Sequence, residues 1–147
     1  MKTVAVRSSA RTGVFCGGAR YPGQVRTLLL IAHGSRQATA NQEVQALAER
    51  LNAEGVAERV EACFLELAEP DLCVASAALV RAGAHEIRVL PLFLNQGRHV
   101  GRDLPALVEV ARRQFPEVRF SLLPHVGAAE GYAALVRDCA DEEPIVS

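Results

Sequence analysis

The sequence has 147 residues, of which 50% are hydrophobic and 5% aromatic, and its formal net charge is −1. This length fits one domain with a real core and is too short for two α/β lobes, so a site that needs two lobes must borrow one from a second subunit. The near-neutral charge argues against nucleic-acid and membrane partners, and the longest apolar runs, at residues 27–32 and 89–94, are far below the ~20 residues of a transmembrane helix. We therefore expect a soluble protein.

The cysteines give little sign of a functional role. Cys16, Cys63, Cys73 and Cys139 form no CxxC pair, and Cys63 and Cys73 have apolar neighbours. This pattern predicts reduced, mostly buried thiols of a cytoplasmic protein, with disulfides or metal ligation as the less favoured alternative.

The first 26 residues differ in composition from the rest. They carry five Lys or Arg and no acidic residue, and they are rich in Gly, Ser and Ala without clear periodicity. We predict a disordered basic extension without function; an organellar presequence or an over-extended start of translation are the alternatives. The folded domain is expected at residues 27–141 and a C-terminal tail at residues 142–147.

From residue 27, short apolar segments alternate with amphipathic ones. Buried strands are predicted at residues 27–32, 59–67, 89–94 and 118–123, each followed by a helix. This repeat predicts an α/β fold with a four-stranded parallel sheet, helices on both faces and the strand order 2-1-3-4. Pro91 cannot donate a ladder hydrogen bond, so we expect a bulge or an unpaired edge beside it.

Capping and turn residues mark the expected helix ends. In chain order they are Thr39 with Gln42 as a capping box, Gly55 as a stop, Pro70 as a start, Gly83 as a stop, Asp103 as a cap with Pro105 in the first turn, and Phe115-Pro116 as a stop. The last helix is indicated by Ala128, Tyr132, Leu135, Val136 and Cys139.

Three chemically active residues, His33, Glu66 and His99, are separated by equal gaps of 33 residues. This gap is about one βαβ repeat, so all three should lie just past the carboxyl ends of adjacent strands. Two imidazoles and a carboxylate in one crevice can bind a divalent ion such as Co, Fe, Ni or Zn and can accept protons near neutral pH. The alternative is that each histidine is merely solvated, and that Glu66 is a surface charge because Leu65 or Leu67 faces inward instead.

Basic and amide side chains surround the same edge of the sheet. Guanidinium groups bind carboxylates in a bidentate manner, so a ligand with several carboxylates would suit them, although solubility and helix-end charge explain them equally well. The residues concerned are Arg36, Arg98, Arg102, Asn95 and Gln96, with Gly34, Gly97 and Gly101 allowing a flat ligand to approach. His125 is expected at the sheet edge, where it is peripheral, and His85 at the opposite end of the strands.

Missing motifs exclude several enzyme classes. The sequence has no GxxxxGK[ST] loop for ATP, no GxSxG elbow of a hydrolase and no GxGxxG dinucleotide fingerprint. The loop that carries His33 reads AHGS without a preceding arginine, which weakens a hydrolase that uses His33 covalently. A binding module that carries a metal or tetrapyrrole without turnover stays open.

These segments resemble the CbiX/SirB family of class II, ATP-independent chelatases. The matching segments are AHGSR at residues 32–36, FLELAEP at residues 64–70 and VLPLFLNQGRHVGRDLP at residues 89–105. The resemblance covers residues 27–137 and implies a chelatase-like fold and the insertion of a divalent metal into sirohydrochlorin, a carboxylate-rich tetrapyrrole. It leaves the metal open among cobalt for cobalamin, iron for siroheme and nickel for a related cofactor.

By this resemblance His33 and His99 are the metal-handling histidines and Glu66 the assisting carboxylate. The length is similar to that of the short, single-domain form of the family, which works as a homodimer. Neither ATP nor another nucleotide is implied.

Overall fold

The structure is a computed structural model that describes residues 25–97, 99–143 and 145. Its strands are β1 (Val25–Ala32), β2 (Arg59–Phe64), β3 (Ala84–Pro91) and β4 (Arg119–Leu122). They form a parallel sheet in the order β2-β1-β3-β4, which confirms the predicted fold class and strand order. The predicted extension lies outside the described residues, except that Val25 and Arg26 belong to β1.

The predicted strand ends need correction. β1 begins two residues earlier than expected, because the charged Arg26 pairs with Glu86 on β3 at 3.4 Å and extends the sheet. β2 ends at Phe64 instead of residue 67, since a positive φ of 61° at Leu67 turns the chain out of the extended conformation. β3 ends at Pro91 instead of residue 94, because β1 ends at Ala32 and offers no further strand for pairing.

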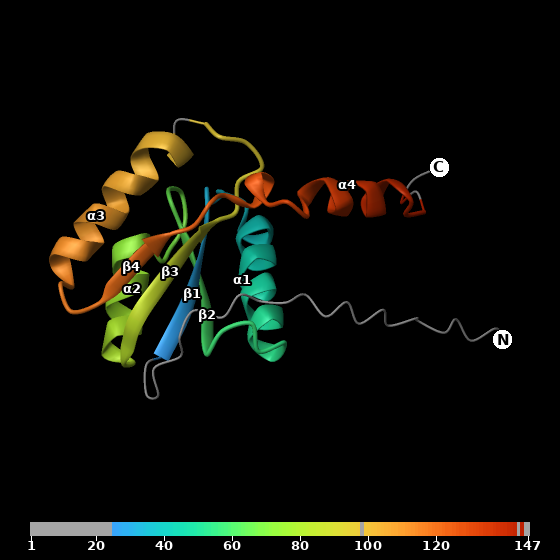
Figure 1. Cartoon of the computed structure of the whole chain (residues 1–147). Coiled ribbons are helices and arrows are strands. Elements are labelled where there is room, and N and C mark those ends of the chain that lie inside the picture. The colour runs from blue at the N-terminus through green and yellow to red at the C-terminus, as the bar shows by residue number, and fades with distance from the viewer. Residues whose placement is uncertain (1–24, 98, 144, 146–147) are drawn as a thin grey trace.

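The helices lie on both faces of the sheet, as predicted. They are α1 (Ala38–Ala53), α2 (Leu72–Arg81), α3 (Leu104–Gln114) and α4 (Tyr132–Ala140), with a π-helical turn η1 (His99–Asp103) before α3 and a 3-10 turn η2 (Val126–Ala128) before α4. α1 covers one face, α2 and α3 cover the other, and α4 leads away from the sheet (Figure 1). Within the described part of the chain, no helix is both long enough and apolar enough to cross a membrane.

The alternation of side chains along β1 divides the core between the two faces. Leu29 and Ile31 pack in the larger cluster with residues of α2 and α3, whereas Leu30 packs in the smaller cluster with Ala48 of α1. All three strand residues are fully buried. Burial on both faces explains why this strand is a continuous apolar run.

Two of the predicted helix starts are wrong in detail. Thr39 lies inside α1, whose N-cap is Gln37 without a side-chain capping bond, so the predicted capping box with Gln42 does not form. Pro70 precedes α2, and the cap is Asp71, whose carboxylate accepts a 2.8 Å hydrogen bond from the Val74 N–H. The third helix has Asp103 at its N-cap and a proline in its first turn, as expected, although Asp103 forms no capping hydrogen bond.

Pro91 causes no bulge in β3. The register shift between β1 and β3 lies at Val25 and Arg26, at the other end of the strands, and Ile31 still pairs with Pro91. On the other side of β3, pairing with β4 ends at Val89, where the Leu123 N–H donates to the Val89 carbonyl at 2.8 Å. The edge next to Pro91 is therefore free of ladder bonds to β4, which is one of the two predicted outcomes.

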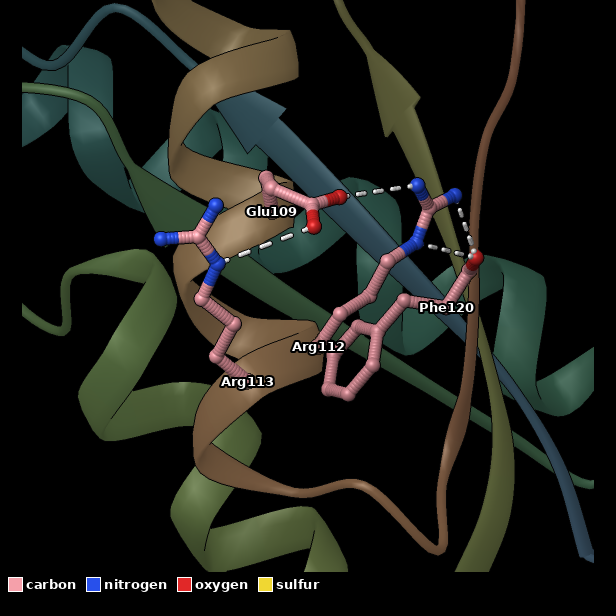
Figure 2. Close-up of polar contacts among 4 residues, drawn as sticks. All are labelled: Glu109, Arg112, Arg113 and Phe120. Carbon is pink, nitrogen blue, oxygen red and sulfur yellow. Dashed lines mark hydrogen bonds and ion pairs between the residues drawn. The ribbon is translucent and has the colours of Figure 1, made fainter.

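The outer edge of β4 is closed by a side chain of α3. Arg112 donates from Nε and Nη2 to the Phe120 carbonyl at 3.2 and 2.9 Å (Figure 2). Glu109 holds this guanidinium at 3.3 Å and also pairs with Arg113 at 3.8 Å. The carbonyl of the edge strand is thus satisfied within the chain and is not offered to another strand.

Candidate functional site at the carboxyl edge of the sheet

The backbone brings two of the three predicted residues together. His33 directly follows β1, and Glu66 lies two residues past β2. The pairing of these strands continues into the loops, because the Leu65 N–H donates to the Ala32 carbonyl and the Glu66 N–H to the His33 carbonyl, both at 2.9 Å. His33 is half-buried and Glu66 is exposed, so an imidazole and a carboxylate stand on neighbouring chains at the edge where ligands bind in open α/β sheets.

Gly34 makes this close approach possible. Its φ of +90° is one that residues with a side chain rarely adopt. A Cβ at this position would overlap with the carbonyl oxygen of Glu66. The glycine in the AHGS segment is therefore required by the position of the neighbouring loop, and it fixes the backbone of His33 against that of Glu66.

The loop after β3 begins beside the loop after β1. The Leu92 N–H donates to the Ile31 carbonyl at 2.8 Å, so the chain leaves β3 next to the end of β1. Asn95 and Gln96 are exposed in this loop, and Arg102 is exposed in η1. The backbone of His99 begins η1, but its side chain and the whole of Arg98 lie outside what the structure describes.

A groove of about 370 Å³ lies between the loop after β1 and the loop after β2. Arg36 lines it together with Leu67 and Glu69. The amide side chains of α1 that line it are Asn41, Gln42 and Gln45. Sequence reasoning had assigned none of these amides to the site, although Gln42 and Gln45 lie three residues apart and so share one face of the helix.

Asn41 fixes the loop that carries His33. Its Oδ1 accepts a hydrogen bond from the Ser35 N–H at 2.9 Å, and its Nδ2 donates to the Ser35 carbonyl at 2.7 Å. The Ser35 hydroxyl in turn accepts from the Gln37 N–H at 3.0 Å. These hydrogen bonds stabilise the start of α1 in place of the predicted capping box.

Replacing Asn41 with alanine should lower the free energy of unfolding by about 1–3 kcal/mol, because two partly buried backbone groups lose their partner. Urea unfolding of the purified variant measures this change. Gln45→Ala is the matched control, since Gln45 lines the same groove on the same helix, while the side-chain hydrogen bonds within the described loop are made by Asn41 and Ser35. Equal losses in both variants would contradict the role given to Asn41.

None of the described thiols, Cys63, Cys73 and Cys139, belongs to a group of three metal-binding side chains, and Cys16 lies outside the described residues. Cys63 is buried, and burial, with a smaller effect of the nearby Asp71 carboxylate, raises its pKa, which disfavours the thiolate form. Cys73 is partly exposed, and Cys139 is exposed on α4, which corrects the expectation that the cysteines are mostly buried. Among the side chains that the structure describes, no three His, Cys, Asp or Glu residues form a metal-binding group, and His99 lies outside that search.

His85 lies at the opposite edge of the sheet, as predicted, but it belongs to β3 and does not precede that strand. His85 is at the amino end of β3, in an open pocket with Glu86 and Glu117 at the opposite edge of the sheet. His125 follows β4, the edge strand, and is half-buried as the residue before η2. Of the two, His85 is at the opposite end of the strands from His33 and Glu66.

Comparison with known proteins identifies the family. The family model described as CbiX matches residues 27–143, which include all the described strands except the start of β1. The chain belongs to the CbiX family. A CbiX protein from Marinobacter aquaeolei VT8, known from a crystal structure, matches this CbiX-family chain with a TM-score of 0.69 and 30% identity over 78% of this chain and 93% of that one.

Two longer relatives match with similar identity. The sirohydrochlorin ferrochelatase of Bacillus subtilis is 38% identical over 106 residues, which are 71% of this CbiX-family chain and 40% of that protein. The crystal structure of the sirohydrochlorin chelatase SirB from Bacillus subtilis subspecies spizizenii in complex with cobalt has a TM-score of 0.70 and 33% identity, covering 78% of this chain and 49% of that one. The chain thus spans about half the length of these two relatives.

Proposed function

We propose that this protein inserts a divalent metal, Co²⁺ or Fe²⁺, into sirohydrochlorin without ATP, in the biosynthesis of cobalamin or siroheme. The observation that carries the proposal is the pairing of the loops of His33 and Glu66 through the 2.9 Å hydrogen bond between their backbones. Membership of the CbiX family and the likeness to a sirohydrochlorin ferrochelatase and to a cobalt-bound SirB support it. Both ions suit imidazole and carboxylate ligands.

Metal insertion needs an ion stripped of water and two pyrrole N–H protons removed. The imidazoles of His33 and His99 would bind the incoming ion and take up these protons, and Glu66 would orient an imidazole or accept a proton. The ion is a substrate, so the ligands must release it to the macrocycle. Few protein ligands and an exposed carboxylate suit such transient binding better than a closed structural site would.

The acid side chains of the macrocycle need cationic and amide partners. Arg36, in the groove next to the Glu66 loop, is the described arginine best placed for them, and Arg98 and Arg102 would serve the other side of the ring. Asn95 and Gln96 are exposed and can donate hydrogen bonds to further carboxylates. The flat ring would lie across the carboxyl edge of the sheet.

The proposal includes a homodimer. The chain corresponds to about half of a SirB chain, so a second copy would supply the surface that the other half supplies in the longer protein. A ring that lies on an open edge is exposed to water on one side, and a facing subunit would cover it.

A metallation assay tests the function. Metal-free sirohydrochlorin in excess over protein is mixed with Co²⁺, Fe²⁺ or Ni²⁺ separately, and the change in the absorbance spectrum is followed. We expect many turnovers per subunit with Co²⁺ or Fe²⁺, and His85→Ala, at the opposite edge of the sheet, should leave the rate unchanged. A rate equal to that of the protein-free mixture would refute the enzyme, and a single stoichiometric binding event would identify a carrier.

A further inference from the structure

Leu67, in the loop after β2, has an unusual backbone conformation. Its φ of 61° lies in the left-handed region, and every other positive φ among the described residues belongs to a glycine. A residue with a Cβ adopts this conformation only at an energetic cost, because the Cβ comes too close to the following carbonyl oxygen. Such strained positions cluster at functional sites, and Leu67 directly follows Glu66.

The Leu67 side chain adds little to the core. It is 54% exposed and belongs to neither core cluster of the described residues. Leu65, two residues earlier, packs against the larger cluster, and a continued extended backbone would place both leucines on the same side. The left-handed turn ends this alternation. Glycine would adopt the same φ without strain and would lose no buried contact, so the stability of a single chain does not explain a leucine here.

Hydrogen bonds on both sides of Leu67 hold this conformation. Before it, the Glu66 N–H donates to the His33 carbonyl at 2.9 Å. After it, the Pro70 carbonyl accepts from the Phe64 N–H at 2.9 Å, which closes the loop at its base. A strained residue persists where the surrounding structure determines its backbone in this way. The fold therefore fixes the backbone of Leu67 relative to those of Glu66 and His33.

Leu67 is the largest apolar side chain in a groove that is otherwise polar. The groove of about 370 Å³ is the one lined by Arg36 and the three amide side chains of α1. Arg36 and Leu67 are both exposed. A guanidinium and amides suit carboxylates, whereas an exposed leucine suits an apolar surface. A ligand that fits both carries carboxylates on an apolar framework, and a tetrapyrrole with acid side chains has this chemistry.

We propose that Leu67 is a substrate-binding residue whose side chain packs against an apolar edge of the macrocycle while Arg36 binds one of its carboxylates. The inference rests on the proposed function and adds to it the contact that distinguishes a tetrapyrrole from a small polycarboxylate. Because Leu67 follows Glu66 directly, this contact also sets where the ring lies relative to the Glu66 carboxylate. The left-handed backbone holds an apolar side chain in the groove instead of in the core.

Removal of the Leu67 side chain should weaken the binding of metal-free sirohydrochlorin, measured by absorbance titration without metal. Leu67→Gly adopts the same backbone conformation freely, and Leu67→Asn introduces a polar residue that tolerates it. Both should raise the dissociation constant by about fivefold to tenfold, as expected when part of a leucine side chain is no longer buried by the ligand. Leu67→Met keeps an apolar side chain of similar volume and should stay within about twofold of the unchanged protein.

The stability of the protein should change in the opposite direction. Leu67→Gly removes the backbone strain and should raise the midpoint of urea unfolding. Val56→Gly is the matched control, because Val56 is 47% exposed, lies in the loop before β2 at the opposite edge of the sheet, and has no positive φ. This control should lower the midpoint and leave the affinity for sirohydrochlorin unchanged. Damage to the fold cannot explain a variant that is more stable and binds its substrate less tightly.

The outcomes separate this inference from the proposed function. If the unchanged protein binds and metallates sirohydrochlorin and Leu67→Gly binds it equally well, Leu67 is no substrate contact, although the function stands. A lower urea midpoint of Leu67→Gly together with a loss of affinity would assign a structural role and overturn the inference. A weaker homodimer with unchanged affinity, measured by light scattering, would assign Leu67 to the subunit contact and overturn it as well. If the unchanged protein binds no sirohydrochlorin, the inference and the proposed function both fail.

Discussion

Alanine at position 33 is expected to lower kcat/KM for the metallation of sirohydrochlorin by about 10²-fold or more. His33 stands directly after β1 with its backbone bonded to Glu66, and an imidazole that binds the ion and takes up a proton supplies two effects that alanine cannot replace. Loss of a positioned general base alone costs about 10²–10⁴-fold. The assay is the absorbance change on metal insertion, with the rate measured over a range of sirohydrochlorin concentrations.

Two controls make the His33 result specific. His85→Ala removes an imidazole from the opposite edge of the sheet and should keep the rate of the unchanged protein. Unfolding in urea checks that His33→Ala still folds, since the half-buried ring contributes less to stability than a core residue does. Activity of His33→Ala within about threefold of the unchanged protein, with both controls normal, would mean that other groups handle the ion and the protons.

The arrangement of the sheet could be predicted because its signal is repeated. Each buried strand is a run of apolar residues, and each is followed by a helical pattern, so four repeats leave few possible topologies. The equal gaps from His33 to Glu66 and from Glu66 to His99 follow from this repeat. The structure confirms that the loop of His33 contacts the loop of Glu66, while the position of the His99 ring stays a prediction.

The ends of the elements could not be predicted from the same signal. Apolar runs do not stop where pairing stops, so Phe93 and Leu94 read as strand although no strand lies beside them. The start of β1 is misjudged for a related reason, because the charged Arg26 does not look like a strand residue although it pairs with Glu86 on β3. The start of α1 was missed because Asn41 holds Ser35 from six residues away, beyond the spacing of a capping box.

The groove was missed for a different reason. The pattern of Asn41, Gln42 and Gln45 is typical of the polar side of a surface helix, and only the position of the loop after β2 shows that these residues line a groove.

Gly34→Ala should destabilise the protein by about 2–4 kcal/mol and lower the metallation rate. Two costs add up: a left-handed backbone that alanine adopts with difficulty, and a methyl group that overlaps with the Glu66 carbonyl oxygen. Relief of the overlap moves the Glu66 loop away and breaks the 2.9 Å hydrogen bond to His33. Urea unfolding and the metallation assay measure the two effects.

Gly83→Ala separates these two costs. Gly83 has a φ of +92°, nearly equal to the +90° of Gly34, but a Cβ there meets nothing within 4 Å. It lies after α2 at the far end of the strands, so alanine should cost only the backbone strain of about 1–2 kcal/mol and leave the rate of metallation unchanged. The difference between the two variants therefore measures the contact between the loops of His33 and Glu66. If both variants lose equal stability and keep equal activity, that contact does not hold the site together, and the pairing of the two loops cannot be the basis of the chemistry.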